Sequence, residues 1–511
     1  MAVSISPAGV TLEDVWRVVA GAPVEITEPV WDRIRSARRV IEDIVESGRT
    51  VYGINTGFGR LADVLIPPER LRELQEHLVI SHAAGVGPPL PDEIVRAMMF
   101  LRVSTFARGC SGPREETVEL LVEMLNRAVT PVVPSKGSVG ASGDLAPLAH
   151  LALAVIGRGR CRLADGSELP SADALERVGL KPLVLEAKEG LALTNGTQAM
   201  TALGAEALRR AEHLCRVIDV VCAISIDALL GTDVAFDPRI HEARGHPGQI
   251  AVARVLKDLL TSSPLRDSHR DCLRVQDAYA MRCAPQVHGA VRDSLAHVRS
   301  VLEREINAVT DNPLVLDDEV LSGGNFHGAP VAVVLDLLGI AMTDLASISE
   351  RRIERMVNPD LSGLPAFLAP DPGVNSGFML PHVTAASLVA ESRVLAHPAS
   401  VDSISTSAGQ EDHVSMGTHA GRKALEIVGN AECVVGIELL AAVQALDLRA
   451  PVKTAPVLES VRALVRDSVP VWLQDREAAP DMEAVIDLVR GPKIVEMVFA
   501  GSDETETEAK P

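Results

Sequence analysis

Residues 137–150, Gly-Ser-Val-Gly-Ala-Ser-Gly-Asp-Leu-Ala-Pro-Leu-Ala-His, contain a tripeptide that can become a chemical reagent. The nitrogen of Gly143 can attack the carbonyl of Ala141, and loss of water from the ring and from Ser142 would leave an electrophilic exocyclic methylene. Glycine is needed because a Cβ would obstruct ring closure, and serine is needed because its hydroxyl is eliminated. The alternative is that this loop is only a turn and a helix cap, and the two interpretations are compatible.

The second half of this stretch predicts a helix over residues 145–156. Asp144 is placed to cap the free N–H groups of its first turn. Pro147 lies in that turn, where proline is tolerated, and Gly157 is a stop signal. Positive potential is expected where a loop leads onto a helix N-terminus.

The whole string from Gly137 to Leu148 resembles the signature of the aromatic amino acid ammonia-lyases. The resemblance runs from Thr11 to about Leu446. It implies a 4-methylidene-imidazol-5-one group (MIO), formed autocatalytically from Ala141, Ser142 and Gly143. It also implies a homotetramer in which loops from three subunits surround each active site, which composition and periodicity do not show.

Eliminating ammonia from an amino acid requires an electrophile, a base for the Cβ proton and a cation for the carboxylate. Tyr52, in Val-Tyr-Gly-Ile-Asn-Thr-Gly-Phe-Gly, aligns with the catalytic tyrosine on the family's mobile loop, or it anchors that loop by its hydroxyl. Asn195 matches a family asparagine that supports the MIO oxygen and the substrate carboxylate. Its alternative is structural, because Asn195-Gly-Thr-Gln198 resembles a capping box. Phe326, in Asn-Phe-His-Gly, matches a phenylalanine beside the cofactor or is a core aromatic.

The stretch Arg274–Val287 is a second strong motif of the family. If it is helical, Gln276, Tyr279 and Arg282 stand at i, i+3 and i+6 and share about 120° of one face. An amide, a phenol and a guanidinium would then point at one cavity. Arg282 suits the substrate carboxylate because its fork of donors matches two oxygens, and its alternative is an ordinary surface ion pair.

Two stretches bear on the choice of substrate. Ser81-His82 is a polar pair that suits a ring with N–H and lone-pair sites, although some tyrosine aminomutases resemble it here. In Gln-Glu-Asp-His-Val-Ser-Met (410–416), Glu411 would give an imidazole N–H a charged acceptor. Burying that carboxylate against a plain phenyl ring would leave it unpaired, at a large cost. The string resembles the members of the family that act on histidine, and its alternative is a solvated acidic patch.

These residues predict the non-oxidative elimination of ammonia from L-histidine to give trans-urocanate. Arg282 and Asn195 would hold the carboxylate, His82 and Glu411 would hold the imidazole, and Tyr52 or Glu411 would be the base. Whether the MIO group bonds to the amine or to the ring is left open. Two alternatives remain: a tyrosine or phenylalanine lyase or aminomutase that uses the same group, and a non-catalytic helical relative.

The overall composition restricts the class of protein. Of the 511 residues 47% are hydrophobic but only 3% are aromatic, so the core must be built from Ala, Val, Leu and Ile. A net charge of −20 and a pI near 5.2 argue against a nucleic-acid or anionic-membrane surface. The seven cysteines form no C-x-x-C pair, the N-terminus lacks a signal peptide, and no uncharged apolar run approaches ~20 residues. We therefore expect a soluble, cytoplasmic protein.

The histidines show no spacing typical of metal ligands. His241 and His246 are five residues apart rather than four, and Gly245 and Pro247 would break a helix there. The pair is therefore not a zincin motif. The other histidines are scattered, so no required metal is predicted.

Apolar periodicity predicts a mainly α fold, with a smaller mixed N-terminal domain carrying the MIO loop on a long helical bundle. Thr11 and Asp14 indicate a capping box, and Val30, Ile34, Ala37, Ile41 and Ile44 share one face of a helix that Gly48 ends. Further helices are predicted over 69–84, 92–107, 115–128, 195–230, 330–357 and 415–446, with an irregular segment or hairpin at 161–182. The predicted domains are residues 1–195 and 196–501, followed by a disordered acidic tail at 502–511.

Overall fold

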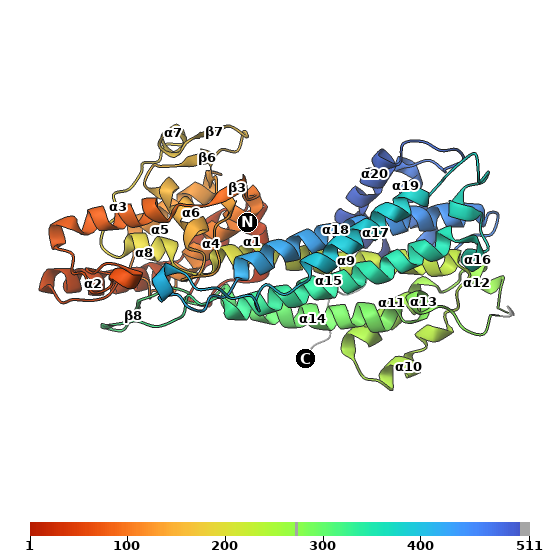
Figure 1. The fold of residues 1–511 in the computed structure, drawn as a ribbon, viewed down its shortest axis with the longest axis horizontal. Coiled ribbons are helices and arrows are strands. Elements are labelled where there is room, and N and C mark those ends of the chain that lie inside the picture. Colours follow the sequence, from red (N-terminus) through yellow and green to blue (C-terminus); the bar gives the residue numbers. More distant parts are fainter. Residues whose placement is uncertain (271–273, 501–511) are drawn as a thin grey trace. The chain divides into compact units, whose positions relative to one another are not determined.

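The computed structural model describes residues 1–270 and 274–500, and Figure 1 labels its helices and strands. The tail predicted at 502–511 lies outside the described residues. The chain divides into two compact units. Unit 1 comprises Met1–Glu206, Arg299–Asp336 and Pro398–Arg422, and unit 2 comprises Ala207–Val298, Leu337–His397 and the chain from Lys423 onward. Unit 1 thus includes two segments from the second half of the chain, whereas the prediction placed one boundary after residue 195 and assigned everything beyond it to the second domain. That division stays a prediction about independently folding domains.

Unit 1 contains mostly short helices, with short strands between them. The strands form four small sheets, in which β1 pairs with β2, β3 with β5, β6 with both β4 and β7, and β8 with β9. Its helices are α1 (Leu12–Val19), α2 (Glu28–Ser47), α3 (Leu71–His82), α4 (Asp92–Phe106), α5 (Glu115–Asn126), α6 (Leu145–Val155), α7 (Ser171–Arg177) and α8 (Glu189–Thr194). Its strands are β1 (Val3–Ile5), β2 (Val24–Ile26), β3 (Val86–Pro89), β4 (Thr130–Pro131), β5 (Pro134–Lys136), β6 (Arg160–Arg162), β7 (Glu168–Pro170), β8 (Leu314–Leu316) and β9 (Glu319–Leu321).

The first helix begins where the sequence predicts, and the second ends where it predicts. Thr11 and Asp14 form the capping box of α1, with each side chain bonded to the other's backbone N–H. The predicted apolar face of α2 is buried along its whole length, and Gly48 ends the helix with φ 68°. Part of that face packs against Ile54, two residues beyond Tyr52. The apolar periodicity of α2 therefore anchors the loop that carries Tyr52.

Unit 2 is built around long helices. Figure 1 shows α9, α14, α15 and α18 running beside one another as rods. The four helices, each of which has its larger part in unit 2 and one end in unit 1, are α9 (Gln198–Ala228), α14 (Ala284–Glu305), α15 (Ala329–Val357) and α18 (Gly417–Leu448). The remaining helices of this unit are α10 (Pro238–Glu242), α11 (Pro247–Leu259), α12 (Pro264–Asp267), α13 (Tyr279–Arg282), α16 (Pro359–Ser362), α17 (Met379–Leu395), α19 (Pro456–Ser468), α20 (Ala478–Arg490) and α21 (Lys493–Phe499).

A buried ionic cluster ties these rods together. The carboxylate of Glu438 on α18 accepts two hydrogen bonds from Arg352 on α15, at 2.5 and 2.8 Å. The same carboxylate accepts from the hydroxyls of Ser225 on α9 and Ser349 on α15, each at 2.6 Å. Every oxygen of the pair is thus satisfied, as a buried charge requires.

The mainly helical fold is confirmed, but several helices were not predicted. The hairpin in 161–182 is present as β6 and β7, and α7 follows it directly. Helices α14 and α17 were missed. In α17 the buried residues Ala385 and Val389 are accompanied by exposed Leu380, Val383 and Val394. Apolar residues on both faces obscure the 3.6-residue period on which the sequence prediction relied.

One helix in the described part of the chain, α15, is long and apolar enough to cross a membrane by length and composition. Its most apolar window has a mean hydropathy of 2.0, and 61% of that window is buried inside the protein. A core helix of a soluble protein passes the same test. Packing inside the protein therefore accounts for most of that apolar window.

Candidate active site

A cavity of about 1290 Å³ lies within unit 1. Stretches far apart in sequence line it: the loop after Tyr52, the end of α3, the loop before α6, the end of α8, and segments near 322–327 and 407–414. Of the residues predicted to form the site, the cavity is lined by Tyr52, His82, Ala141, Ser142, Asn195, Phe326 and Glu411. The tertiary structure thus brings together seven side chains that the sequence scatters over 360 positions.

The loop before α6 is bent into a conformation that few residues adopt. Ser142 and Gly143 both have positive φ, at 53° and 79°. A Cβ on Gly143 would lie 2.2 Å from the carbonyl oxygen of Gly196, so only glycine fits. The N–H of Gly196 donates to the carbonyl of Ser142 at 3.3 Å, and the N–H of Asp144 donates to that of Gly196 at 2.7 Å. These two bonds hold the tripeptide against the residues that follow α8.

Asp144 does not cap α6, and this prediction is wrong. Its side chain makes no capping bond to α6, but accepts from the N–H of Met200 in the first turn of α9 at 2.9 Å. It also accepts from the hydroxyls of Ser138, at 3.2 Å, and Thr418. The carboxylate is fully buried, and burial raises its pKa. Asp144 therefore ties the reactive loop to two long helices, because those partners approach it only in the folded chain.

Glu411 faces the reactive loop across the cavity. One carboxylate oxygen accepts from the hydroxyl of Ser142 at 3.2 Å. The other accepts from the hydroxyls of Thr406, at 2.9 Å, and Ser407. A charged acceptor thus lies beside the atom that the predicted chemistry eliminates. Thr406 and Ser407 were not singled out by sequence, since only their position beside Glu411 reveals them.

His82 ends α3 and presents one ring nitrogen as an acceptor. Its Nδ1 lies 2.8 Å from the carbonyl oxygen of Leu78, which can only accept, so Nδ1 carries the proton. Nε2 is then left with a lone pair. Burial lowers the pKa of His82, with the Leu78 carbonyl and the charge of Glu411 acting in the opposite direction. The ring therefore stays neutral at pH 7.

The helix that carries His82 packs closely against α8. A Cβ on Gly190 would lie 2.6 Å from the backbone oxygen of Gln75, so the two helices approach as closely as they do only because residue 190 is glycine. The side-chain oxygen of Gln75 also accepts from the N–H of Leu191 at 3.2 Å. This contact sets His82 at the end of α3 relative to Asn195 at the end of α8.

Asn195 follows the last turn of α8 and does not open α9, so the capping-box interpretation is wrong. Its side-chain N–H groups donate to Oδ1 of Asp311 at 3.1 Å and to the carbonyl of Asn312 at 3.0 Å. The other oxygen of Asp311 accepts from the ammonium of Lys188 at 2.8 Å. The amide oxygen of Asn195 is buried and has no hydrogen-bond partner. Lys188 and Asp311 were missed, because nothing in the sequence indicates that these distant residues pair.

Tyr52 and Phe326 complete the predicted lining. Tyr52 is half-buried, and its hydroxyl accepts from the N–H of Gly59 at 3.4 Å. Phe326 lies beside His327, whose ring stacks on that of His413 with centroids 5.9 Å apart. The lining is therefore mixed, with a phenol, a phenyl ring and imidazoles around the reactive loop.

Gln276, Tyr279 and Arg282 belong to unit 2 and are not among the residues that line the cavity. The predicted helical face is wrong, because α13 spans only Tyr279–Arg282 and Gln276 precedes it. The guanidinium of Arg282 lies 4.8 Å from the ring centroid of Tyr279, and its Nε donates to the carbonyl of Asp277 at 2.9 Å. Asp277, in a position the helical pattern overlooked, accepts from the N–H of Thr232 at 2.7 Å.

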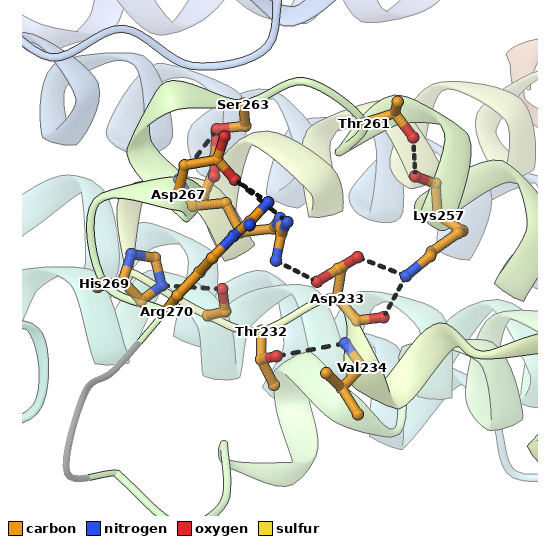
Figure 2. Close-up of polar contacts among 12 residues, drawn as sticks. Thr232, Asp233, Val234, Lys257, Thr261, Ser263, Asp267, His269 and Arg270 are labelled. Carbon is orange, nitrogen blue, oxygen red and sulfur yellow. Dashed lines mark hydrogen bonds and ion pairs between the residues drawn. The ribbon is translucent and has the colours of Figure 1, made fainter.

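The residues around Thr232 form a polar network that Figure 2 shows in close-up. Asp233 faces Lys257 and also accepts from Arg266 at 2.5 Å. His269 lies between two backbone carbonyls, those of Leu265 and Gly231, at 2.8 and 3.1 Å. The network fixes the chain before the motif, and Asp277, inside the motif, is bonded to Thr232 of the same region.

No group of three or more His, Cys, Asp or Glu side chains that could hold a metal occurs within residues 1–270 and 274–500. His241 is buried, with its Nε2 lying 3.0 Å from the carbonyl oxygen of Ala235 and its Nδ1 2.9 Å from the amide nitrogen of Gln249. Both ring nitrogens of His241 are therefore occupied by structural hydrogen bonds.

Comparison with known proteins identifies the class. The sequence profile of the family described as aromatic amino acid lyase matches residues 10–467, so the chain belongs to this family. It is 54% identical over 490 residues to a histidine ammonia-lyase of Anaeromyxobacter sp. (strain K), covering 94% of this chain and 96% of the relative. The family and such relatives identify the chain as a carbon–nitrogen lyase.

Two solved structures support the fold. The crystal structure of histidine ammonia-lyase from Trypanosoma cruzi matches with a TM-score of 0.92 at 44% identity, covering 100% of this chain and 99% of that one. A tyrosine aminomutase from Streptomyces globisporus matches with a TM-score of 0.93 at 36% identity, covering 98% and 99%. The resemblance expected from the reactive loop is thereby confirmed.

Proposed function

We propose that this protein converts L-histidine to trans-urocanate and ammonia. The observation that carries the proposal is the position of Glu411, which accepts from Ser142 in a cavity that His82 also lines. The lone pair of His82 Nε2 and the carboxylate of Glu411 are both acceptors, and either of them suits the single N–H group of a neutral imidazole ring. The relatives named histidine ammonia-lyase, at 52–54% identity over more than 90% of the chain, point the same way.

The reactive loop fits the formation of the MIO group. The nitrogen of Gly143 would bond to the carbonyl carbon of Ala141, and two water molecules would leave, one carrying the Ala141 oxygen and one carrying the Ser142 hydroxyl. The Ser142 carbonyl, which accepts from the N–H of Gly196, would be retained as the ring carbonyl. Once formed, the group supplies an electrophile for the amine or for the ring. The absence of a Cβ on Gly143 and the positive φ of Ser142 favour this closure.

The remaining roles are assigned to this chain's own side chains. Tyr52 or Glu411 would take the Cβ proton, since both line the cavity. Arg282 would bind the carboxylate, with Gln276 and Tyr279 beside it. Tyr279 is 71% exposed, which suits a residue that faces a neighbouring subunit. We therefore propose a homotetramer with active sites shared between subunits, and a soluble, cytoplasmic enzyme.

A second candidate, a tyrosine or phenylalanine lyase or aminomutase, is favoured by the match to a tyrosine aminomutase. It would have to place a ring without N–H groups against Glu411, and a phenyl ring offers that carboxylate no hydrogen-bond donor in place of water.

A direct assay separates these candidates. The protein is incubated separately with histidine, tyrosine and phenylalanine, and the ultraviolet absorbance of each unsaturated product is followed. We expect turnover of histidine, and none in Ser142→Ala or in Gly143→Ala. Turnover of tyrosine, with no turnover of histidine, would establish the second candidate. If no substrate reacts and the absorbance of the MIO group is missing, the chain is a non-catalytic relative.

The shared active site is tested by mixing two inactive variants. Ser142→Ala removes the electrophile and Arg282→Met removes the cation. If one site draws these residues from different subunits, refolding the two variants together restores part of the activity. Mixed oligomers without activity would contradict the shared site.

A further inference from the structure

The structure contains a buried chain of polar contacts that leads from an ion pair to the cavity. Lys188 and Asp311 are fully buried, with the ammonium 2.8 Å from the carboxylate. Asp311 in turn accepts from the side-chain amide of Asn195, which lines the cavity. Both members of the ion pair lie outside the cavity lining. Asp311 thus reaches the cavity through the side chain of Asn195 and through the backbone of Asn312, which also lines it.

The ion pair determines which way the amide of Asn195 points. An ionised carboxylate can only accept, and so can the backbone carbonyl of Asn312. Both accept from Nδ2 of Asn195, at 3.1 and 3.0 Å. Turning the amide over would set its oxygen against two other oxygens. The ammonium of Lys188 donates to the other oxygen of Asp311 at 2.8 Å, a charge-assisted hydrogen bond that fixes the carboxylate.

With both N–H groups engaged, Asn195 has only its oxygen left for a molecule in the cavity. That oxygen is buried and has no partner within the protein. A buried acceptor without a donor is costly, so a ligand that supplies an N–H is favoured there. A carboxylate cannot supply one, and neither can the MIO group, whose ring nitrogens carry no hydrogen. The Ser142 carbonyl already accepts from the N–H of Gly196.

The backbone of Asn195 is held as firmly as its side chain. Arg102, which is fully buried, donates to the carbonyls of Ala192 and Asn195 at 2.9 Å each. Burial lowers the pKa of Arg102 to about 10, so it remains a cation at pH 7. Asn195 thus has little freedom to turn its N–H groups toward the cavity.

We propose that Asn195 accepts a hydrogen bond from the substrate's α-amino group, and that Lys188 and Asp311 are the positioning residues that keep its oxygen free for this role. This inference rests on the proposed function for the identity of the substrate. It differs from the role implied by the family resemblance, in which the asparagine supports the MIO oxygen and the substrate carboxylate. The ligand class that Asn195 would recognise is a primary amine joined to an imidazole ring by a short carbon chain.

Two analogues separate an amine contact from a carboxylate contact. Histamine keeps the amine and lacks the carboxylate, whereas 3-(imidazol-4-yl)propanoate keeps the carboxylate and lacks the amine. Dissociation constants of both are measured by calorimetry for the wild-type enzyme, for Asn195→Leu and for the double variant Lys188→Met/Asp311→Leu. Thr117→Val is the matched control, because it removes a 2.5 Å hydrogen bond to buried Glu189 on the same helix without touching Asn195.

We expect both test variants to bind histamine at least about tenfold more weakly, as for the loss of one charge-assisted hydrogen bond. Binding of the propanoate should change less than about twofold, and the control should bind both analogues as the wild type does. Weaker binding of the propanoate alone, or equal weakening of both analogues, would overturn the proposal. If the double variant does not fold, Asn195→Leu decides alone.

Failure of the proposed function can be told apart from failure of this inference. Turnover of histidine by the wild-type enzyme tests the function and does not depend on the variants. A wild type that binds histamine but does not turn over histidine would contradict the function only. Unchanged histamine binding in Asn195→Leu, in an enzyme that does turn over histidine, would contradict the inference only.

Discussion

The two units each contain a fully buried ion pair, and the two pairs have different surroundings. Arg352 and Glu438 in unit 2 lie between long helices, and every carboxylate oxygen has both an arginine and a serine partner. In unit 1, Lys188 lies at the start of α8 and its partner Asp311 lies in a loop. Asp311 passes its constraint to Asn195, whose oxygen stays without a partner.

This difference indicates different purposes for the same costly arrangement. Burying two charges removes their hydration, and their attraction regains much of it only when all hydrogen bonds are made. In unit 2 the complete set of bonds joins three helices. In unit 1 the bonds end at Asn195, which lines the cavity and whose side-chain oxygen has no hydrogen-bond partner. A cluster that served stability alone would not need such an unsatisfied atom. We infer that the first pair supports the fold and the second supports the site.

The largest effect is expected when one charge of the helix pair is removed. Arg352→Met leaves the Glu438 carboxylate buried without its cation, which should destabilise the protein by about 3–5 kcal/mol. The midpoint of urea unfolding, taken at one protein concentration, measures this. The KM for histidine of the folded fraction should not change. A raised KM would break the distinction between the two pairs.

Replacing each pair by apolar residues sharpens the comparison. Arg352→Met/Glu438→Leu and Lys188→Met/Asp311→Leu should both recover much of the stability that a single change loses, because no charge is left unpaired. Only the variant of unit 1 should lose activity, by about tenfold in kcat/KM, equivalent to about 1.4 kcal/mol. Equal activity in the two double variants would show that both pairs are merely structural.

Glu411 tests the cavity itself. Glu411→Gln keeps the size of the side chain but removes the charge that faces His82 and Ser142. A hydrogen bond to a charged group contributes about 1.5–3 kcal/mol, which the variant would lose. We expect kcat/KM for histidine to fall by about 10- to 150-fold. Asp412→Asn, the neighbouring carboxylate, is the control and should change it little. Similar losses in the two variants would indicate a general effect of charge.

The smallest effect concerns pH. Burial lowers the pKa of His82 below its usual 6.5. Nε2 therefore keeps its lone pair until the pH falls below this lowered pKa. In the window between the lowered pKa and 6.5 the unfolded chain binds the proton more readily, so stability falls as the pH is lowered through it. Substrate binding should weaken in the same direction, since protonated His82 no longer accepts.

The measurement compares the pH profile of kcat/KM for the wild type with that for His82→Gln. The substrate imidazole titrates in the same range in both cases, so the difference between the profiles reports His82. A matched change at buried His288 of unit 2, which faces Asp219 and Arg352, should alter the pH dependence of stability but not of KM. If His288→Gln changed the pH profile of kcat/KM, the assignment of the catalytic pH dependence to unit 1 would be contradicted.

Local features were predictable where neighbouring residues carry the whole interaction. The capping box of α1 joins residues three apart, and the buried face of α2 repeats within one helix. The tripeptide proposed as the electrophile precursor was singled out for the same reason, because its proposed chemistry lies in three consecutive residues. Asp144 was misplaced, since its partners Met200 and Thr418 are 56 and 274 positions away.

The sequence by itself determined the helical class, and it predicted an electrophile precursor in Ala141-Ser142-Gly143 and an acceptor at Glu411. These depend on residue type and short-range spacing, which a linear pattern retains. Only the tertiary structure decided that Asn195 offers an oxygen rather than its N–H groups. That orientation depends on Lys188 and Asp311, whose charges meet across 123 positions once the chain has folded.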